Sequence, residues 1–218
     1  MFKSMKISLL NYKQKFNFSS IKKIDGWLTF YEARQLYFLA RKCSGRGPII
    51  EIGSWKGRST LALAQGVLSG HNNNIIYAID PHVGSEEHKK NGKIWTYNEF
   101  LDNTNKNNIA HIIKPLIKTS SEALKDVDKG VELIFFDGDH SYEAIKQDYL
   151  DWEEKIITNG FIAFHDSVSW AGPSKVVDEF IFKSNKFKNI RLKGTLLTAV
   201  KVDNINFIQK IHKFYIYF

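Results

Sequence analysis

Two aspartates and a histidine directly follow one apolar segment of the sequence. Asp137, Asp139 and His140 come after the run VELIFF. Carboxylates are the ligands that hard divalent cations prefer, and an imidazole, with an ordinary pKa near 6.5, accepts a proton at neutral pH. This group is therefore suited to proton transfer, to metal binding, or to both.

Similar groups stand at the ends of other apolar runs. Asp80 ends NIIYAID, His165 and Asp166 end GFIAFHD, and Glu51 lies within PIIEIG. Apolar runs that alternate with helical patterns predict βαβ units and a parallel sheet that is buried on both faces. Ligands of such sheets bind at the carboxyl ends of the strands. We therefore expect these groups to converge at one edge of the sheet.

The elements that must position these groups alternate regularly along the chain. The helix predicted at 29–42 opens with a capping box formed by Thr29 and Glu32. Strands are predicted at 48–53, 74–80, 111–119, 131–137 and 160–166, and further helices at 58–70, 94–108, 120–127 and 141–157. This order predicts a single α/β domain, with a core at about 27–202 and extensions at 1–26 and 203–218.

The turn EIGSWKGRST, residues 51–60, indicates the kind of ligand. Gly53 and Gly57 allow a tight turn and a close approach of a ligand, and Ser54 and Ser59 place hydroxyls near a helix N-terminus. The turn matches neither G-x-G-x-x-G nor a P-loop. Asp80 stands where a carboxylate accepts the two hydroxyls of a ribose. A nucleoside without phosphates is favoured, and S-adenosylmethionine is the candidate.

Four separated motifs carry a family resemblance. In order, PIIEIGSWKGRSTLALA, IIYAIDPHVGS, LIFFDGDHSYEAIKQDYLDWEEKI and GFIAFHD resemble the class I S-adenosylmethionine-dependent methyltransferases, and most closely the methyltransferase 24 group with its metal-dependent sugar and macrolide O-methyltransferases. The likeness covers about residues 45–170. It implies a Rossmann-like, doubly wound, mostly parallel seven-stranded sheet, with a reversed C-terminal strand in a hairpin around Gly194.

The resemblance also implies roles for individual residues. Ser59 would cap its helix, Asp80 would hold the ribose and Ser120 would lie near the adenine. A divalent cation (Mg, Mn or Fe) would be held by Asp137, His165 and Asp166, although His165 stands where many relatives carry a carboxylate. The general base would be Asp139, which matches the base position of the sugar-methylating relatives, or His140. The full set of implied cofactor positions is Glu51, Gly53, Ser54, Gly57, Ser59, Asp80, Ser120 and Asp137.

The resemblance thus predicts O-methylation of a small hydroxylated acceptor such as a sugar or glycan precursor, with or without a metal. Two alternatives stay open at this point. The D-x-D of Asp137 and Asp139 is also typical of metal-dependent glycosyltransferases that bind nucleotide sugars. The fold can also serve as a module that binds S-adenosylmethionine without catalysis.

The composition limits the cellular compartment and the kinds of partner that we expect for this protein. The single cysteine, Cys43, excludes an internal disulfide, and we expect a cytoplasmic protein. The net charge is +8, but the lysines are scattered rather than gathered in a basic arm, so the sequence disfavours a nucleic-acid partner. No apolar run reaches the roughly 20 residues of a membrane span. A homo-oligomer is left open.

Overall fold

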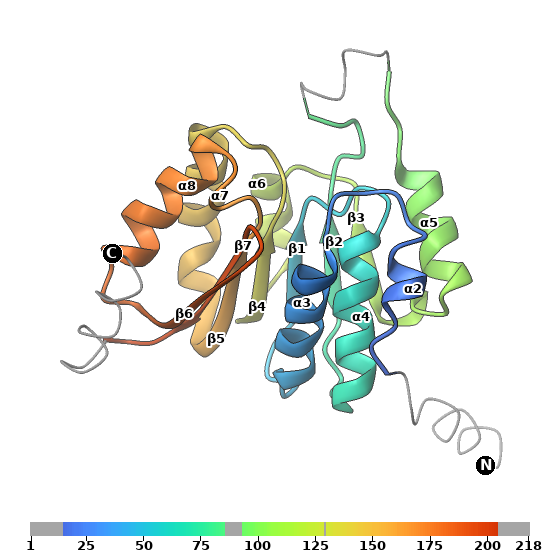
Figure 1. Ribbon diagram of the computed structural model, residues 1–218, viewed down its shortest axis with the longest axis horizontal. Helices are drawn as coiled ribbons and strands as arrows, with labels where there is room; N and C mark the ends of the chain where they lie inside the picture. Colours follow the sequence, from blue (N-terminus) through green and yellow to red (C-terminus); the bar gives the residue numbers. More distant parts are fainter. Residues whose placement is uncertain (1–14, 86–92, 129, 205–218) are drawn as a thin grey trace.

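The computed structural model describes residues 15–85, 93–128 and 130–204, and within them seven strands form one sheet (Figure 1). The strand order is β3-β2-β1-β4-β5-β7-β6. Strands β1 to β5 pair in parallel, whereas β7 runs antiparallel to both β5 and β6. The expected seven-stranded sheet with one reversed strand is confirmed. The strands are β1 (Ile49–Ile52), β2 (Ile76–Ile79), β3 (Ile113–Leu116), β4 (Val131–Phe136), β5 (Ile156–Phe164), β6 (Phe187–Lys193) and β7 (Leu196–Lys201).

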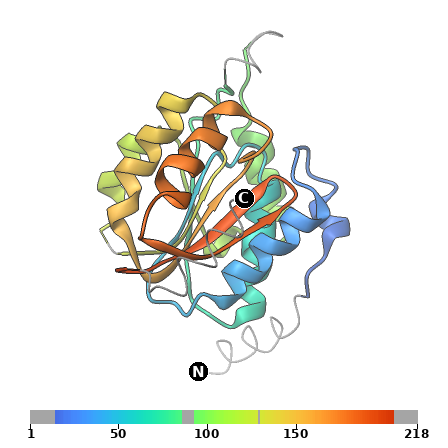
Figure 2. The same cartoon turned by 60° about the vertical axis from the view of Figure 1, so that its left-hand side comes forward.

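Helices cover both faces of the sheet, which lies between two layers in Figure 2. One layer holds α2 (Phe18–Ile21), α3 (Phe30–Lys42) and α4 (Arg58–Gly70), and the other holds α6 (Ser120–Ala123), α7 (Tyr142–Trp152) and α8 (Ala171–Val176). Helix α5 (Tyr97–Lys106) lies near α2 and α4 (Figure 1). Short 3-10 turns span Ala110–Ile112, Leu124–Asp126 and Glu153–Lys155, and a π-helical segment spans Val177–Phe182.

Strand β4 shows why the central runs are apolar throughout. Ile134 and Phe136 belong to the core beneath α6, α7 and α8, whereas Leu133 and Phe135 belong to the core beneath α3 and α4. Successive side chains of a strand point to opposite faces, so a strand covered on both faces needs apolar residues at every position. Each fully buried side chain of this size contributes about 1.5–3 kcal/mol to folding.

Several boundaries differ from the sequence-based expectation. Strand β5 begins at Ile156, before Gly160, because α7 ends at Trp152 and a short turn follows. His111 lies in the turn before β3 rather than in the strand. Ile21 and Ile24, in the expected N-terminal extension, are buried in the core beneath α3 and α4. The expected C-terminal extension lies, apart from residues 203 and 204, outside the described residues.

The helices of the described ranges are all too short or too polar to cross a lipid bilayer.

Candidate active site

A cavity of about 630 Å³ lies at the carboxyl ends of the parallel strands. It is bounded by the segments that follow β1, β2, β3, β4 and β5, as the parallel topology requires. The structure therefore brings most of the predicted site residues to one cavity. Those that line it are Gly53, Ser54, Ser59, Asp80, Ser120, Asp137, Asp139, His140, His165 and Asp166, whereas Glu51 and Gly57 lie outside the lining.

The turn after β1 depends on glycine. Gly53 has a φ of +85°, and a Cβ built on it would lie 2.0 Å from the carbonyl oxygen of Asp137. A side chain at this position would thus separate the tips of β1 and β4. The expectation that Ser59 caps α4 is wrong, because the N-cap is Gly57, with a φ of 91°. Ser59 is buried one residue inside the helix and lines the cavity.

Glu51 lies behind this turn and is fully buried. The hydroxyl of Thr60 donates to its carboxyl group at 2.5 Å. Burial raises the pKa of Glu51 to about 8, and the hydrogen bonds from Ser59 and Thr60 oppose that rise. At neutral pH the group is therefore largely protonated, and it braces the turn from inside the protein.

Asp80, at the tip of β2, is held by backbone donors. The N–H of Trp55 donates to Oδ2 at 2.7 Å, and the N–H of His82 donates to Oδ1 at 2.6 Å. A carboxylate oxygen accepts two hydrogen bonds, so each oxygen keeps one acceptor site. Asp80 lines the cavity and can accept two hydroxyl donors of a ligand there. His82 itself is fully buried, and its ring contacts Thr96, Tyr97 and Phe100.

His165 lies among three carboxylates. Its Nδ1 is 2.9 Å from Asp137 Oδ1 and 3.2 Å from Asp166 Oδ2, and its Nε2 is 3.5 Å from Glu32 Oε2. Burial disfavours a charge on the ring, but attraction to Asp137 and hydrogen bonds with all three carboxylates outweigh it and raise the pKa of His165 to about 12. His165 is therefore a buried cation.

Glu32 joins this group from helix α3. Its Oε2 accepts hydrogen bonds from the backbone N–H and the hydroxyl of Thr29, which confirms the predicted capping box. Its Oε1 accepts from the backbone N–H and the hydroxyl of Thr195, between β6 and β7. Burial raises the pKa of Glu32, but the bonds with His165, Thr29 and Thr195 outweigh it and lower the value to about 2. The sequence predicts only the capping-box role of Glu32 and not its contact with His165.

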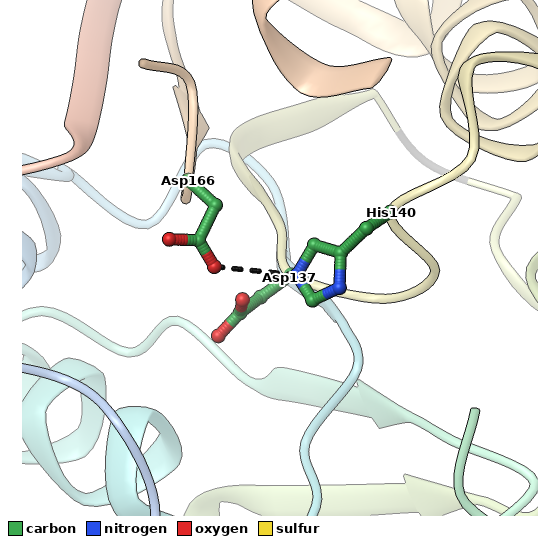
Figure 3. A group of neighbouring side chains, drawn as sticks. All are labelled: Asp137, His140 and Asp166. Carbon is green, nitrogen blue, oxygen red and sulfur yellow. Dashed lines mark ion pairs between the residues drawn. The ribbon is translucent and has the colours of Figure 1, made fainter. Parts of the chain in front are cut away.

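His140 and Asp166 form a second pair at the same edge (Figure 3). Nε2 of His140 lies 3.2 Å from Oδ2 of Asp166, and the ring stacks on Trp170 with centroids 4.5 Å apart. Burial raises the pKa of Asp166, but hydrogen bonds with His140, His165 and Ser169 hold it far below its usual range. The imidazole is thus fixed between an ionised carboxylate and an indole.

Three residues at this edge lie close enough together to share a metal ion. Asp137, His140 and Asp166 each place one ligand atom within 4.8 Å of the others (Figure 3). The predicted group contained His165 instead of His140. Nδ1 of His165 lies between the two carboxylates, 2.9 Å from Asp137 Oδ1 and 3.2 Å from Asp166 Oδ2. The two carboxylates that a cation would need are therefore already bridged by an imidazole.

Other cavity residues were not assigned by sequence reasoning. Trp27 and Trp55 pack together with ring centroids 5.9 Å apart, and Asp148 reaches the cavity from α7. A tryptophan in a loop and an acid on an amphipathic helix give no signal of their own in the sequence. Their presence in the cavity follows from how the N-terminal segment and α7 pack.

The fold, the glycine turn and the acidic residue at the tip of the second strand define a nucleoside-binding α/β protein of the Rossmann-like type. Residues 50–167, more than half of the chain, match the model of the methyltransferase 24 family, described as a methyltransferase domain. The chain therefore belongs to this family of S-adenosylmethionine-dependent methyltransferases. The glycosyltransferase alternative is thereby set aside.

The chain is also similar to individual proteins, and the solved structures among them share its fold. Over 120 residues the chain is 28% identical to y4gI, an uncharacterized protein of Sinorhizobium fredii, and the match covers 55% of this chain but 13% of that protein. A Corynebacterium glutamicum structure is similar with a TM-score of 0.66 at 13% identity, over 94% of this chain and 99% of the other. The O-methyltransferase TomG of Streptomyces achromogenes, solved with S-adenosylmethionine, gives 0.63 at 13% identity, over 91% and 95%.

The buried cation gives the first prediction. The pKa of His165 is raised from 6.5 to about 12, so its contribution to stability is complete below pH 6.5 and is lost as pH rises toward 12. His165→Gln should lower the free energy of unfolding by roughly 3–5 kcal/mol at about pH 7, because it leaves buried carboxylates unpaired. The deficit should shrink by up to about 1.4 kcal/mol per pH unit above that pH. Urea unfolding at several pH values measures both quantities.

The exposed His111 provides the matched control. His111→Gln should leave stability within about 0.5 kcal/mol of wild type at every pH. A stability deficit of His165→Gln that is independent of pH would show that His165 is uncharged in the folded protein.

Proposed function

We propose that the protein transfers the methyl group of S-adenosylmethionine to a hydroxyl oxygen of a small acceptor. The observation that carries this proposal is the arrangement of one cavity, with Asp80 at its β2 side and the His140–Asp166 pair at its β5 side. The first can accept ribose hydroxyls, and the second can accept a proton. In the strand order, the Gly53 turn and Asp137 lie between them, which suits the methionine part and the sulfonium.

The reaction needs alignment and removal of one proton. The acceptor oxygen attacks the methyl carbon in line with the carbon–sulfur bond, and the electron pair of that bond returns to sulfur. The Nε2–H of His140 faces Asp166 at 3.2 Å, so the hydroxyl proton moves to Nδ1 of this ring, and Asp166 stabilises the imidazolium that forms. Trp170 holds the ring in place by stacking. Asp139 contributes by positioning, because its Oδ1 accepts the N–H of Ser141 at the start of α7.

The bridging by His165 leads us to propose a reaction without a metal. Asp137, His140 and Asp166 are close enough to share a cation, but His165 already supplies positive charge to both carboxylates. A dication bound there would have to compete with the His165 imidazole for both carboxylates. The residues therefore fit a divalent metal poorly, and no step is assigned to one.

The acceptor we favour is a sugar or glycan precursor. Trp27 and Trp170 line the cavity with exposed fractions of 65% and 42%. Exposed indole faces offer flat apolar surfaces with a polar edge, which suits a ring that carries both C–H groups and hydroxyls. TomG, similar in fold, is an O-methyltransferase of tomaymycin synthesis, so acceptors other than sugars belong in the same screen.

Removal of the ribose-binding carboxylate tests the cofactor assignment. Asp80→Ala should weaken binding of S-adenosylhomocysteine by at least about tenfold, since two hydrogen bonds to a buried carboxylate are lost. Isothermal titration calorimetry measures the dissociation constant. Asp102→Ala, at an exposed position on α5, should bind like wild type. Saturable binding that is equal in wild type and Asp80→Ala would refute this role of Asp80.

Replacement of the imidazole tests the base. His140→Gln should lower kcat by about 10²–10⁴-fold while S-adenosylhomocysteine binding stays within about twofold of wild type. Release of S-adenosylhomocysteine, measured across sugars, nucleotide-linked sugars and phenols, gives the turnover. Asp139→Asn should lower kcat by a smaller factor than His140→Gln does. If Asp139→Asn abolishes turnover and His140→Gln does not, the base is Asp139. Cofactor binding without turnover on any acceptor would support a non-catalytic module.

Chelation tests the metal-free reaction. Turnover should be unchanged after exhaustive treatment with EDTA, and added Mn²⁺ or Mg²⁺ should not raise it, because the His165 imidazole already contacts both Asp137 and Asp166. The same turnover assay is run before chelation, after it and after return of each cation. Activity that disappears with EDTA and returns with one cation would show that a metal takes part.

A further inference from the structure

The outer side of helix α3 carries an unusual set of side chains. Every residue that α3 exposes to solvent is either aromatic or cationic, and these residues are Phe30, Tyr31, Arg34, Phe38, Arg41 and Lys42. At about 100° per residue they fall within an arc of about 120° around the helix axis, so they form one continuous stripe. We call this stripe the α3 face.

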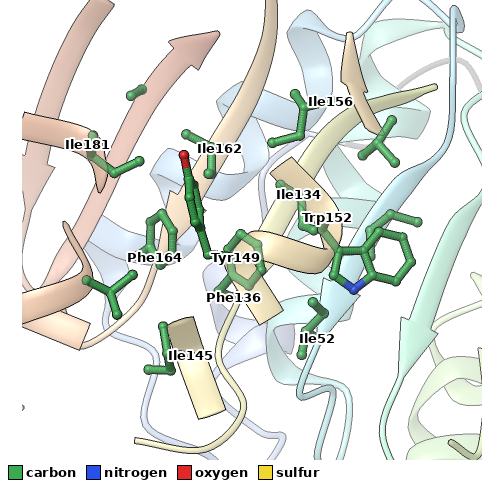
Figure 4. Packing of buried hydrophobic residues seen from close by; sticks show 14 of the residues in the cluster. Ile52, Ile134, Phe136, Ile145, Tyr149, Trp152, Ile156, Ile162, Phe164 and Ile181 are labelled. Carbon is green, nitrogen blue, oxygen red and sulfur yellow. The ribbon is translucent and has the colours of Figure 1, made fainter. Parts of the chain in front are cut away.

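Helix α7, in the opposite layer, shows how a covering helix of this protein otherwise divides its residues. Its large apolar side chains Ile145, Tyr149 and Trp152 pack in the core that Figure 4 shows. Its exposed residues are polar except for Leu150. Helix α3 also buries an apolar face, so its exposed aromatic side chains are additional to those that the core uses. Apolar surface gathered on one exposed face is typical of an interaction site.

Neighbouring side chains hold the aromatic rings of the α3 face in place. Phe30 contacts Phe18 and Tyr31 edge to face, with ring centroids 5.2 Å and 5.4 Å apart. The guanidinium of Arg34 lies over the ring of Phe38, 5.3 Å from its centroid. Tyr31 is nevertheless 66% exposed and Phe30 40% exposed. The face therefore presents aromatic surface directly beside positive charge.

The charge in this part of the chain has one sign. Residues 15–42 expose the cations Lys15, Lys22, Lys23, Arg34, Arg41 and Lys42. The two acids of the same range do not offset them, because Glu32 is buried beside His165 and Asp25 pairs with Lys56 at 3.0 Å. A partner that complements this surface is anionic as well as apolar.

An anionic lipid surface has both properties. Aromatic side chains favour the boundary between headgroups and acyl chains, cations are attracted to anionic headgroups, and a helix face that carries both lies in the plane of that boundary. A single-stranded nucleic acid also attracts cations, but its bases stack on open aromatic faces. Here Arg34 covers a face of Phe38, and two other rings contact Phe30. The arrangement favours lipid.

We propose that the α3 face docks the protein on an anionic membrane surface. Trp27, which lines the cavity, stands three residues before Phe30 in the chain. Docking therefore places the Trp27 side of the cavity rim close to the lipid headgroups. The inference goes beyond the proposed reaction and does not depend on it, because the α3 face lies outside the cavity lining.

Vesicle co-sedimentation of the full chain tests the proposal. Wild type should bind vesicles of phosphatidylcholine mixed with phosphatidylglycerol at least about tenfold more tightly than vesicles of phosphatidylcholine alone. Added salt should weaken this binding, because it screens the attraction. The double variant Arg34→Glu, Arg41→Glu should bind the anionic vesicles at least about thirtyfold more weakly, the effect of removing two cations from contact with such a surface.

A second double variant, Tyr31→Ser with Phe38→Ser, tests the aromatic part of the face. It should weaken binding to anionic vesicles by at least about tenfold, because apolar surface no longer enters the boundary region. The matched control is Lys125→Glu with Lys175→Glu, which changes the net charge by the same amount in the opposite helical layer and should bind like wild type. All variants should bind S-adenosylhomocysteine like wild type, and thermal unfolding establishes that each is folded.

Three results would overturn the proposal. The first is anionic-vesicle binding that is absent in wild type or equal in wild type and Arg34→Glu, Arg41→Glu. The second is a wild-type dimer that Tyr31→Ser, Phe38→Ser converts to a monomer in sedimentation velocity without lipid, which would assign the face to a second copy of the chain. The third is tighter binding to a single-stranded oligonucleotide than to vesicles, lost in the arginine variant, which would assign the face to nucleic acid.

Discussion

The active-site edge of this protein depends on the compensation of buried charge. Glu32, Asp137 and Asp166 come from three different elements and lie around one imidazole, with nitrogen to oxygen distances of 2.9–3.5 Å. Carboxylates so close together in a buried place repel one another unless a cation lies between them. His165 supplies that cation and connects α3 with the ends of β4 and β5 at this edge.

The two ends of the cavity are built by different means. At the β2 end, backbone N–H groups of Trp55 and His82 orient Asp80, and Gly53 allows the tips of β1 and β4 to approach closely. At the β5 end, the site residues are positioned by other side chains and not by the backbone. His165 bridges carboxylates, and Trp170 stacks on His140. The first construction suits a ligand that is always the same. The second suits chemistry that requires a movable proton.

The sequence shows which ionisable residues stand at the strand ends, but it does not show which residues contact them. Asp80, Asp137 and Asp166 follow apolar runs, and parallel topology alone brings such residues together. Glu32 and Asp148 reach the cavity from helices, where their sequence neighbours indicate only a capping box or an amphipathic surface. His165 illustrates the limit most clearly. Whether a histidine there serves as a metal ligand or as a cation depends on a third carboxylate more than 130 residues away in the chain, at position 32.

The link between Glu32 and Thr195 has a consequence for how the protein can diverge. Glu32 binds the start of α3, the β6–β7 connection and His165 at once, so these three segments form one connected unit at the β5 side of the cavity. A single replacement within the unit leaves a buried charge without its partner. Lineages that acquire a new acceptor are therefore expected to change the rim, at residues such as Trp27 and Trp170, while the charged unit is inherited as a block.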